Sequence, residues 1–482
     1  MRASPRFSGI ALLLCGLSLG AQSPKGGDKT ATILSALDAR AAHYGDVAHQ
    51  IWGFAEVGYQ EVKSSALLQS ELAAAGFTMK AGIAGMPTAF TAEYGSGKPV
   101  IAIIGEFDAL PGLSQAAVPT QQPIIAGGSG HGCGHHLFGT AATASAIAVK
   151  EWMIANKITG TLRFYGTPAE EGGAGKVYMV RDGLFDDVDV AVTWHPGDRN
   201  DVAASSSLAN ISGKFRFKGV SAHAAASPEQ GRSALDAVEA MDVMVNMMRE
   251  HVPQETRIHY VITNGGKAPN VVPDFAEVYY VVRHPDIKTV DAIWERVLGA
   301  AKGAALGTGT TYDLVVTGAV YNLLINQTLA RVQQKALERV GGYSYTAEET
   351  AFAEKLQKTL ISAVPLESVQ KIQPLDFTPP AGGGSTDVGD VSWRVPTVQM
   401  SAATWVPGTP AHSWQAVAAG GMSIGAKGMV VAAKTMALTA AELFTSPATI
   451  AAARAEFEKQ RGLNFVYATR LGTQKPALDY RK

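Results

Sequence analysis

A short motif with one cysteine and three histidines carries the strongest chemical signal in this sequence. Residues 130–136 read GHGCGHH, so Cys133 lies between two glycines and two positions before His135. Glycine lets the backbone approach a bound group closely, and thiolate and imidazole are preferred ligands of zinc and neighbouring divalent metals. A single buried cysteine more often acts as a small apolar side chain. The interpretation of Cys133 as a metal ligand therefore depends on further motifs.

Three other motifs offer ligands of the same class: Glu170 and Glu171 in TPAEEGG, His195 in TWHP and His412 in GTPAHSW. The candidate metal ligands are then Cys133, His135, Glu171, His195 and His412. Five ligands exceed what one catalytic ion with an open position uses, so the set predicts two divalent ions, zinc or manganese. Such ions lower the pKa of a bound water molecule to about 7, and Glu170 is placed to act as general base and then as acid to a leaving amine. These residues indicate a metal-dependent hydrolase that uses a metal-bound hydroxide.

The order of apolar segments explains how these motifs could meet. Short apolar runs at 100–104, 162–165, 188–193 and 397–400 alternate with helical patterns at 31–52, 64–75, 137–154 and 327–340. This alternation predicts an α/β fold with a mostly parallel mixed sheet flanked by helices. Asp108, Glu170 and His195 follow three of these strands, and ligands bind beyond the carboxyl ends of strands in such sheets. We therefore expect these residues to converge.

Residues 209–321 follow a different order. Strands are expected at 211–217, 256–263, 276–283 and 310–317, with helices at 233–251 and 289–305. This order predicts a split βαβ, ferredoxin-like α+β domain. It would be inserted between two parts of a catalytic domain, residues 22–208 and 322–482, with hinges near Ser207 and Tyr321 and a C-terminal tail after the second part.

The N-terminus has the pattern of an export signal. Arg2 and Arg6 precede an apolar run at 10–19, which is too short to span a bilayer. Cys15 leaves a lipoprotein signal open, although Leu14 is larger than the residue usually found before a lipidated cysteine. We expect residues 1–21 to be removed and the protein to be periplasmic or extracellular. Cys133 would then be the only cysteine left, so no internal disulfide could form.

Composition excludes other classes of partner. The 482 residues include 41 basic and 42 acidic side chains, for a net charge of -1, so no global field recruits nucleic acid or an anionic membrane. No segment after the leader is apolar enough to predict a membrane span. The expected ligand is a small molecule.

Seven motifs together resemble the dinuclear-metal carboxypeptidase and aminoacylase superfamily: GEFDALPG, GHGCGHH, TPAEEGG, TWHP, KGVSAHAAASPEQGRSALDA, APNVVPD and GTPAHSW. Within it the chain is similar to the branch of p-aminobenzoyl-glutamate hydrolases of the B-subunit type, indole-acetyl amino acid hydrolases and hippurate hydrolases. The resemblance implies that Cys133 bridges two metals. Glu171 and His412 would complete one site, and His135 and His195 the other.

The same resemblance implies further roles. Glu170 would be the base and Asp108 would orient a ligand. His223, from the inserted domain, would polarise the scissile carbonyl across a homodimer, while Asn270 and Arg283 would bind the substrate carboxylate. His136 and Glu106 depart from the residues that relatives carry at these positions.

The implied reaction is hydrolysis of the amide bond of an N-acyl or N-aroyl amino acid such as p-aminobenzoyl-glutamate. A dipeptidase or aminopeptidase with the same metals is one alternative, and an exported binding protein that has lost catalysis is another. Glu170 argues against the binding protein, since a binder needs no free base beside a metal ligand.

Overall fold

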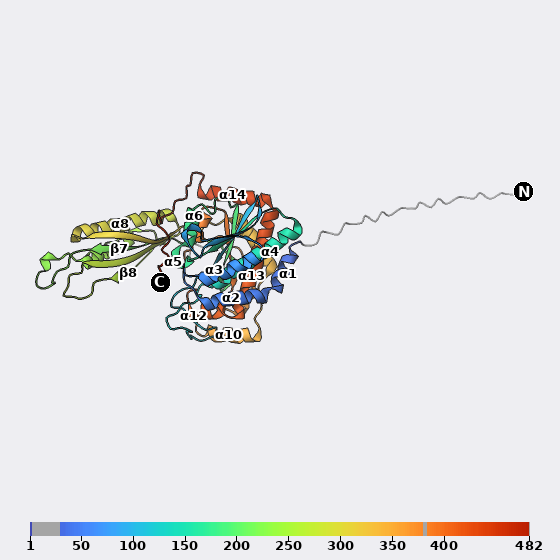
Figure 1. Ribbon diagram of the computed structural model, residues 1–482, viewed down its shortest axis with the longest axis horizontal. Helices are drawn as coiled ribbons and strands as arrows, with labels where there is room; N and C mark the ends of the chain where they lie inside the picture. The colour runs from blue at the N-terminus through green and yellow to red at the C-terminus, as the bar shows by residue number, and fades with distance from the viewer. Residues whose placement is uncertain (2–28, 379–382, 482) are drawn as a thin grey trace.

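The computed structural model describes Met1, residues 29–378 and residues 383–481. Beyond Met1, the expected signal segment lies outside the described residues. Two sheets organise the chain: one of seven strands in the order β1-β2-β4-β3-β5-β11-β6, and one of four in the order β10-β7-β9-β8. Figure 1 shows the second sheet projecting from the body that contains the first.

The predicted parallel strands form the middle of the large sheet. They are β3 (Val100–Glu106), β4 (Gly160–Thr167), β5 (Val190–Gly197) and β11 (Thr397–Ala403), with β3 paired in parallel to both β4 and β5, and β11 to β5. Every residue of β3 is buried, as expected for a strand covered on both faces. The antiparallel strands β1 (Thr78–Ala81), β2 (Phe90–Ser96) and β6 (Asp201–Val202) were not predicted.

Helices cover both faces of the large sheet. Ile101 and Ile103 of β3 pack into one apolar cluster with residues of α4 and α13, while Val100, Ala102 and Ile104 pack into another with residues of α6. The helices are α1 (Ala31–Ala39), α2 (Ala41–Phe54), α3 (Val62–Ala74), α4 (His135–Asn156), α5 (Glu170–Gly173), α6 (Gly175–Arg181), α9 (Gln327–Val340), α10 (Ala347–Gln357), α11 (Val388–Ser392), α12 (Trp414–Gly420), α13 (Ser423–Thr445) and α14 (Pro447–Arg461). The helix expected at 31–52 is thus two helices that meet at Arg40.

One helix among the described residues is long and apolar enough to cross a membrane. This helix is α13, and most of its apolar stretch is buried inside the protein. That burial is typical of the core helix of a globular domain.

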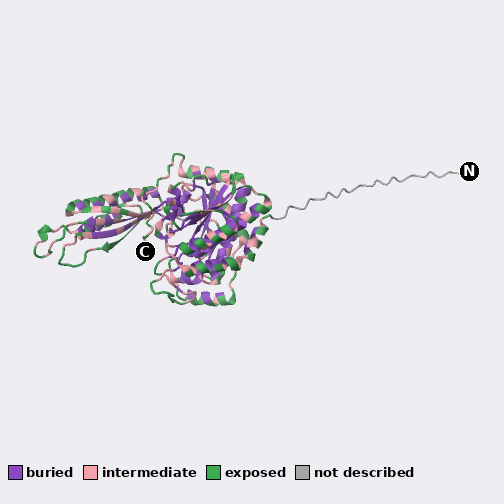
Figure 2. Ribbon diagram, in the orientation of Figure 1, coloured by how far each residue is buried: buried purple, intermediate pink, exposed green. Residues whose placement is uncertain are grey.

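The small sheet confirms the predicted split βαβ order. Its antiparallel strands are β7 (Ala209–Lys218), β8 (Arg257–Asn264), β9 (Phe275–His284) and β10 (Thr311–Val320), and its helices are α7 (Ala234–Met248) and α8 (Ile287–Thr308). Ser233 and Asp286 cap the two helices through side-chain oxygens. We call residues 209–321 the inserted domain. Figure 2 shows that the end of this domain farthest from the large sheet is largely exposed.

Candidate metal centre

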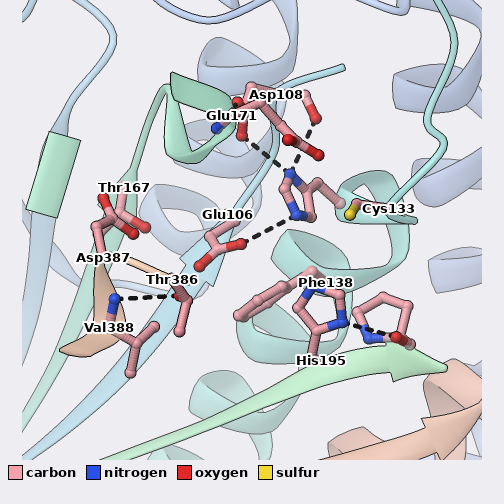
Figure 3. A network of polar contacts seen from close by, with 12 residues as sticks. Glu106, Asp108, Cys133, Phe138, Thr167, Glu171, His195, Thr386, Asp387 and Val388 are labelled. Atoms are coloured by element: carbon pink, nitrogen blue, oxygen red, sulfur yellow. Dashed lines mark hydrogen bonds and ion pairs between the residues drawn. The ribbon is translucent and has the colours of Figure 1, made fainter. Parts of the chain in front are cut away.

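The predicted metal ligands lie together at the carboxyl ends of the parallel strands. One group, Cys133, His135 and His195, has ligand atoms within 4.8 Å of one another, and a second group, Cys133, Glu171 and His412, meets the same limit. Figure 3 shows Cys133, Glu171 and His195 around a common space. Cys133 belongs to both groups, so its sulfur lies within 4.8 Å of the ligand atoms of each.

Close backbone approach explains the glycines around Cys133. A Cβ on Gly132 would lie 2.6 Å from a Leu113 methyl group, and Gly134, at a φ of +76°, would place a Cβ 2.7 Å from Pro196. The Gly132 carbonyl accepts a hydrogen bond of 3.0 Å from the backbone N–H of His412. The glycines thus let the loop lie against the segment that carries the most distant predicted ligand in the sequence.

Asp108 fixes two of the ligands. Its Oδ1 lies 3.0 Å from His135 Nδ1, and its Oδ2 accepts a 2.9 Å hydrogen bond from the Glu171 backbone N–H. Burial acts to raise the pKa of Asp108, but His135, the Glu171 N–H and the charge of Lys176 together hold this pKa below its ordinary value. With Nδ1 used in this way, His135 turns Nε2 toward the other ligands.

The buried polar atoms of the site fit divalent cations. Among the described residues, His135 Nε2, Glu171 Oε1 and both carboxylate oxygens of Glu106 are buried and contact only other ionisable groups. His135 Nε2 lies 3.1 Å from Glu106 Oε2, and His412 Nε2 lies 3.3 Å from Glu171 Oε1. Burial raises the pKa of the Cys133 thiol, so a thiolate there needs a positive charge beside it. Thiolate, imidazole and carboxylate are the donor set that zinc and similar ions accept.

The structure adds three charged residues that the sequence interpretation did not place in the site. Lys176 is completely buried, and its Nζ lies 2.7 Å from Glu106 Oε1 and 2.7 Å from Asp387 Oδ1. The other oxygen of Glu106 lies 3.1 Å from His135 Nε2, and Glu106, His135 and Glu170 form a third group of possible ligands. Figure 3 shows Glu106 between Asp387 and the ligand cluster.

Glu106 left a signal in the sequence, because it ends β3 two positions before Asp108. Lys176 and Asp387 left none, since a lysine and an aspartate are expected at the surface.

Glu170 lies at the edge of the ligand cluster, on the short helix α5. Burial, followed by the negative charges of Glu106 and Glu171, raises the pKa of Glu170 well above its usual range. A carboxylate that holds a proton more tightly than usual is better matched to proton transfer near neutral pH.

A cavity of about 660 Å³ extends from these residues to the inserted domain. Its lining includes Arg283 of β9 and, with Glu170, the candidate ligands Cys133, Glu171, His195 and His412. Arg283 Nη1 lies 3.4 Å from Ser385 Oγ, its Nε is buried without a hydrogen-bond partner among the described residues, and burial lowers its pKa. An anionic group in the cavity could therefore bind the Arg283 guanidinium, whose positive charge has no ion-pair partner among the described residues.

The structure does not bring His223 and Asn270 to this cavity. Both are exposed, and neither belongs to its lining. They lie near each other, since His223 pairs with Val271 in an isolated bridge and the Ala224 N–H donates to the Asn270 carbonyl. Both follow the ends of strands that run away from the large sheet, so the metal ligands and His223 occupy different parts of one chain.

Comparison with known proteins identifies the family. The chain is 44% identical to the B-subunit of p-aminobenzoyl-glutamate hydrolase from Escherichia coli over 415 residues, which cover 81% of this chain and 86% of that protein. Residues 209–308 match the family described as Peptidase dimerisation domain. The chain belongs to the M20 peptidase family.

Two further proteins are similar to this chain. Xaa-Arg dipeptidase of Mus musculus is 28% identical over 88% of this chain and 90% of its own length. A dinuclear metal binding peptidase of the M20 family from Bacillus subtilis shares the fold, with a TM-score of 0.58 at 17% identity over 85% of this chain and 99% of its own. As an M20 member with this ligand cluster, the chain is a metal-dependent amidohydrolase.

Proposed function

We propose that this protein hydrolyses the amide bond of N-acyl or N-aroyl amino acids such as p-aminobenzoyl-glutamate. The observation that carries the proposal is one cavity lined both by Arg283, whose buried Nε has no hydrogen-bond partner among the described residues, and by the metal-ligand cluster with Glu170. A substrate with a free carboxylate at one end and an amide bond a few atoms away matches this arrangement. The E. coli relative, named for hydrolysis of p-aminobenzoyl-glutamate, supports this choice of acyl group.

Two divalent ions, zinc or manganese, would be held by five side chains. Cys133 would contact both, with Glu171 and His412 on one ion and His135 and His195 on the other. Bound ions would supply Lewis acidity for the scissile carbonyl and for the attacking water. Asp108 would hold the His135 ring and the Glu171 backbone in position to bind the ions, through its hydrogen bonds to both.

Glu170 would move the protons. Its carboxylate would accept a proton from the attacking water and donate it to the leaving amine nitrogen, which would otherwise depart as an unstable anion. Its raised pKa suits both steps, since a weak base accepts poorly and a strong acid donates too early.

Arg283 would bind the carboxylate of the amino-acid product half. A guanidinium presents a planar pair of N–H donors that matches a carboxylate, which gives both affinity and orientation. Because the inserted domain carries Arg283, substrate binding would draw this domain toward the metal ligands.

His223 and Asn270 would reach the cavity of a partner subunit. Their exposure and their distance along the inserted domain leave them free for such a contact, and the match to a dimerisation domain over 209–308 supports a homodimer. His223 would polarise the scissile carbonyl and Asn270 would assist Arg283. We also propose, from the N-terminal pattern alone, that the protein is exported.

A substrate panel on metal-reconstituted protein tests the proposal. We expect p-aminobenzoyl-glutamate and other N-acyl amino acids to be hydrolysed, with their C-terminal amides turned over at least tenfold more slowly. Dipeptides ending in arginine form the competing arm, because the mouse relative is named for them. Faster hydrolysis of those dipeptides would replace the acyl-amino-acid assignment, and equal rates on acids and amides would remove the role of Arg283.

A further inference from the structure

The C-terminal segment (residues 463–481) leaves α14 and returns to the metal centre. It contains no helix or strand, yet residues along its length contact the inserted domain, the hinge and the α5 loop. Figure 1 shows this end of the chain beside α5. The C-terminal segment therefore connects these three parts of the fold.

One set of contacts ties this segment to the inserted domain. Arg470 binds the Asp291 carboxylate of α8 through two N–H groups, at 2.8 and 2.6 Å, and its guanidinium lies 4.3 Å from the centre of the Tyr321 ring at the hinge. Farther along, Gln474 Nε2 donates to the Val316 carbonyl of β10 at 3.1 Å. The two-point ion pair and the contact with β10 hold the segment to the inserted domain.

A second set of contacts ends on the loop that carries Glu170 and Glu171. Tyr480 Oη and Arg481 Nη2 both donate to the Glu171 carbonyl, at 3.0 and 2.8 Å. A carbonyl oxygen has two acceptor sites, so these donors fill it. The Leu478 carbonyl accepts from Gln60 Nε2 at 2.7 Å, which fixes the segment just before its last contacts.

The α5 loop needs such support because its backbone is strained. Ala169 and Ala174, at its two ends, have left-handed φ values of 57° and 55°. This conformation is unfavourable for a residue with a Cβ, and it persists only where neighbours hold it. Asp108 holds the Glu171 N–H on one side, and Tyr480 and Arg481 hold its carbonyl on the other.

We propose that the C-terminal segment is a strap that positions Glu170 and Glu171 and couples them to the inserted domain. Tyr480 and Arg481 are its positioning residues at the loop, and Arg470 is its anchor on the inserted domain. The inference rests on the proposed function for the meaning of a correctly placed Glu170. The structural part of the inference, that the segment holds the α5 loop in place, does not depend on the proposed function.

The first test compares two variants of the segment. Tyr480→Phe combined with Arg481→Met should lower kcat at least tenfold, since small displacements of catalytic groups cost ten- to hundredfold, while KM changes less than threefold. It should also lose metal faster on dialysis, because Glu171 is a proposed ligand. Lys475→Met, at an exposed position of the same segment, should match the parent in both respects.

Two controls separate positioning from a general loss of stability. Phe457→Leu, in the buried part of α14, should lower Tm while leaving kcat unchanged. A chain that ends at Pro476 should reproduce the double variant. If the double variant lowers Tm but keeps its kcat and metal, the segment is only structural and the proposal is overturned.

The coupling is tested by adding Arg470→Met. If the segment acts as a strap, Tyr480→Phe should cost less in kcat when Arg470 is already replaced, and independent effects that multiply would refute the coupling. Hydrogen exchange of the 169–174 amides should rise at least tenfold in the Tyr480/Arg481 double variant without substrate. That measurement stands even if no amide substrate is found, so it distinguishes failure of the strap from failure of the proposed function.

Discussion

The metal centre and the outer end of the inserted domain carry equally distinctive motifs, but the first is largely buried and the second is exposed. Around Cys133, ionisable side chains from distant parts of the sequence are buried close together, and they shift one another's pKa values. Around His223 the motif is exposed and held by backbone contacts such as the bridge to Val271. One chain therefore brings the candidate metal ligands together, while His223, which we propose polarises the carbonyl, lies outside their cavity.

Loss of the metal ions should have the largest effect on activity. Variants of the metal centre should lose metal, whereas variants of the outer end of the inserted domain should not. Chelation should abolish activity, and Cys133→Ser should lower the metal content measured after gel filtration, because a neutral hydroxyl replaces a charged thiolate shared by two ions. His223→Ala should retain the parent's metal content. Full metal content and activity in Cys133→Ser would refute the bridging role.

Glu170→Gln should separate chemistry from metal binding within the buried region. We expect kcat to fall by about 10²–10⁴-fold, the usual contribution of a general base, with the metal content unchanged. Glu171→Gln is the matched control and should lose metal instead. Metal loss in Glu170→Gln would mean that the roles of the two neighbouring glutamates are exchanged.

Mixing two inactive variants tests whether the exposed region serves a second subunit. Subunit exchange between His223→Ala and a metal-ligand variant such as His195→Ala should restore activity. With random exchange about half of the dimers are mixed, each with one intact composite site, so recovery approaches about one quarter of the parent activity. Continued inactivity after exchange shown by mass spectrometry would place the action of His223 within its own chain or exclude it.

Burial also explains which strands could be predicted from the sequence and which could not. The parallel strands were predictable because both faces are buried and their apolar runs are continuous, and α9 was predicted at its observed bounds, 327–340. The strands β1 and β6 were missed because they are short and lie at the edges of the sheet, where no run of apolar residues is required.

The candidate site was predictable where residue type alone names the chemistry, as for Cys133 and His135. The buried pair of Lys176 and Glu106 was not, because nothing in the local sequence distinguishes a buried lysine from a solvated one. The contacts of Tyr480 and Arg481 with Glu171 join residues 309 and 310 positions apart, and local patterns do not encode such pairings.

Arg283 lies between the two regions, so its replacement should have an intermediate effect. Arg283→Lys keeps the positive charge but loses the planar fork, and we expect KM for N-acyl amino acids to rise about tenfold with kcat nearly constant. The preference for free acids over amides should shrink in parallel. An unchanged ratio of kcat/KM for acid and amide would show that the carboxylate binds elsewhere.

The smallest expected effect concerns the joint between the regions. Asp390 of α11 accepts hydrogen bonds from the Tyr321 N–H and from Tyr467 Oη, and burial raises its pKa to about 7. The folded protein thus binds a proton that the unfolded chain releases near pH 4, so the contribution of Asp390 to stability is full below about pH 4 and is lost as the pH rises to 7.

Asp390→Asn should remove that dependence, because an amide does not ionise. Its oxygen can accept from the Tyr321 N–H, and its NH2 group can donate to Tyr467 Oη, which would then accept instead of donate. Between pH 5 and 7 the free energy of unfolding of the parent should fall relative to the variant by about 1 kcal/mol per pH unit. Urea denaturation at both pH values measures the difference, and other titrating groups cancel between the two proteins. Parallel pH profiles would mean that Asp390 is already ionised in the fold, with Arg470 nearby as the group that neutralises it.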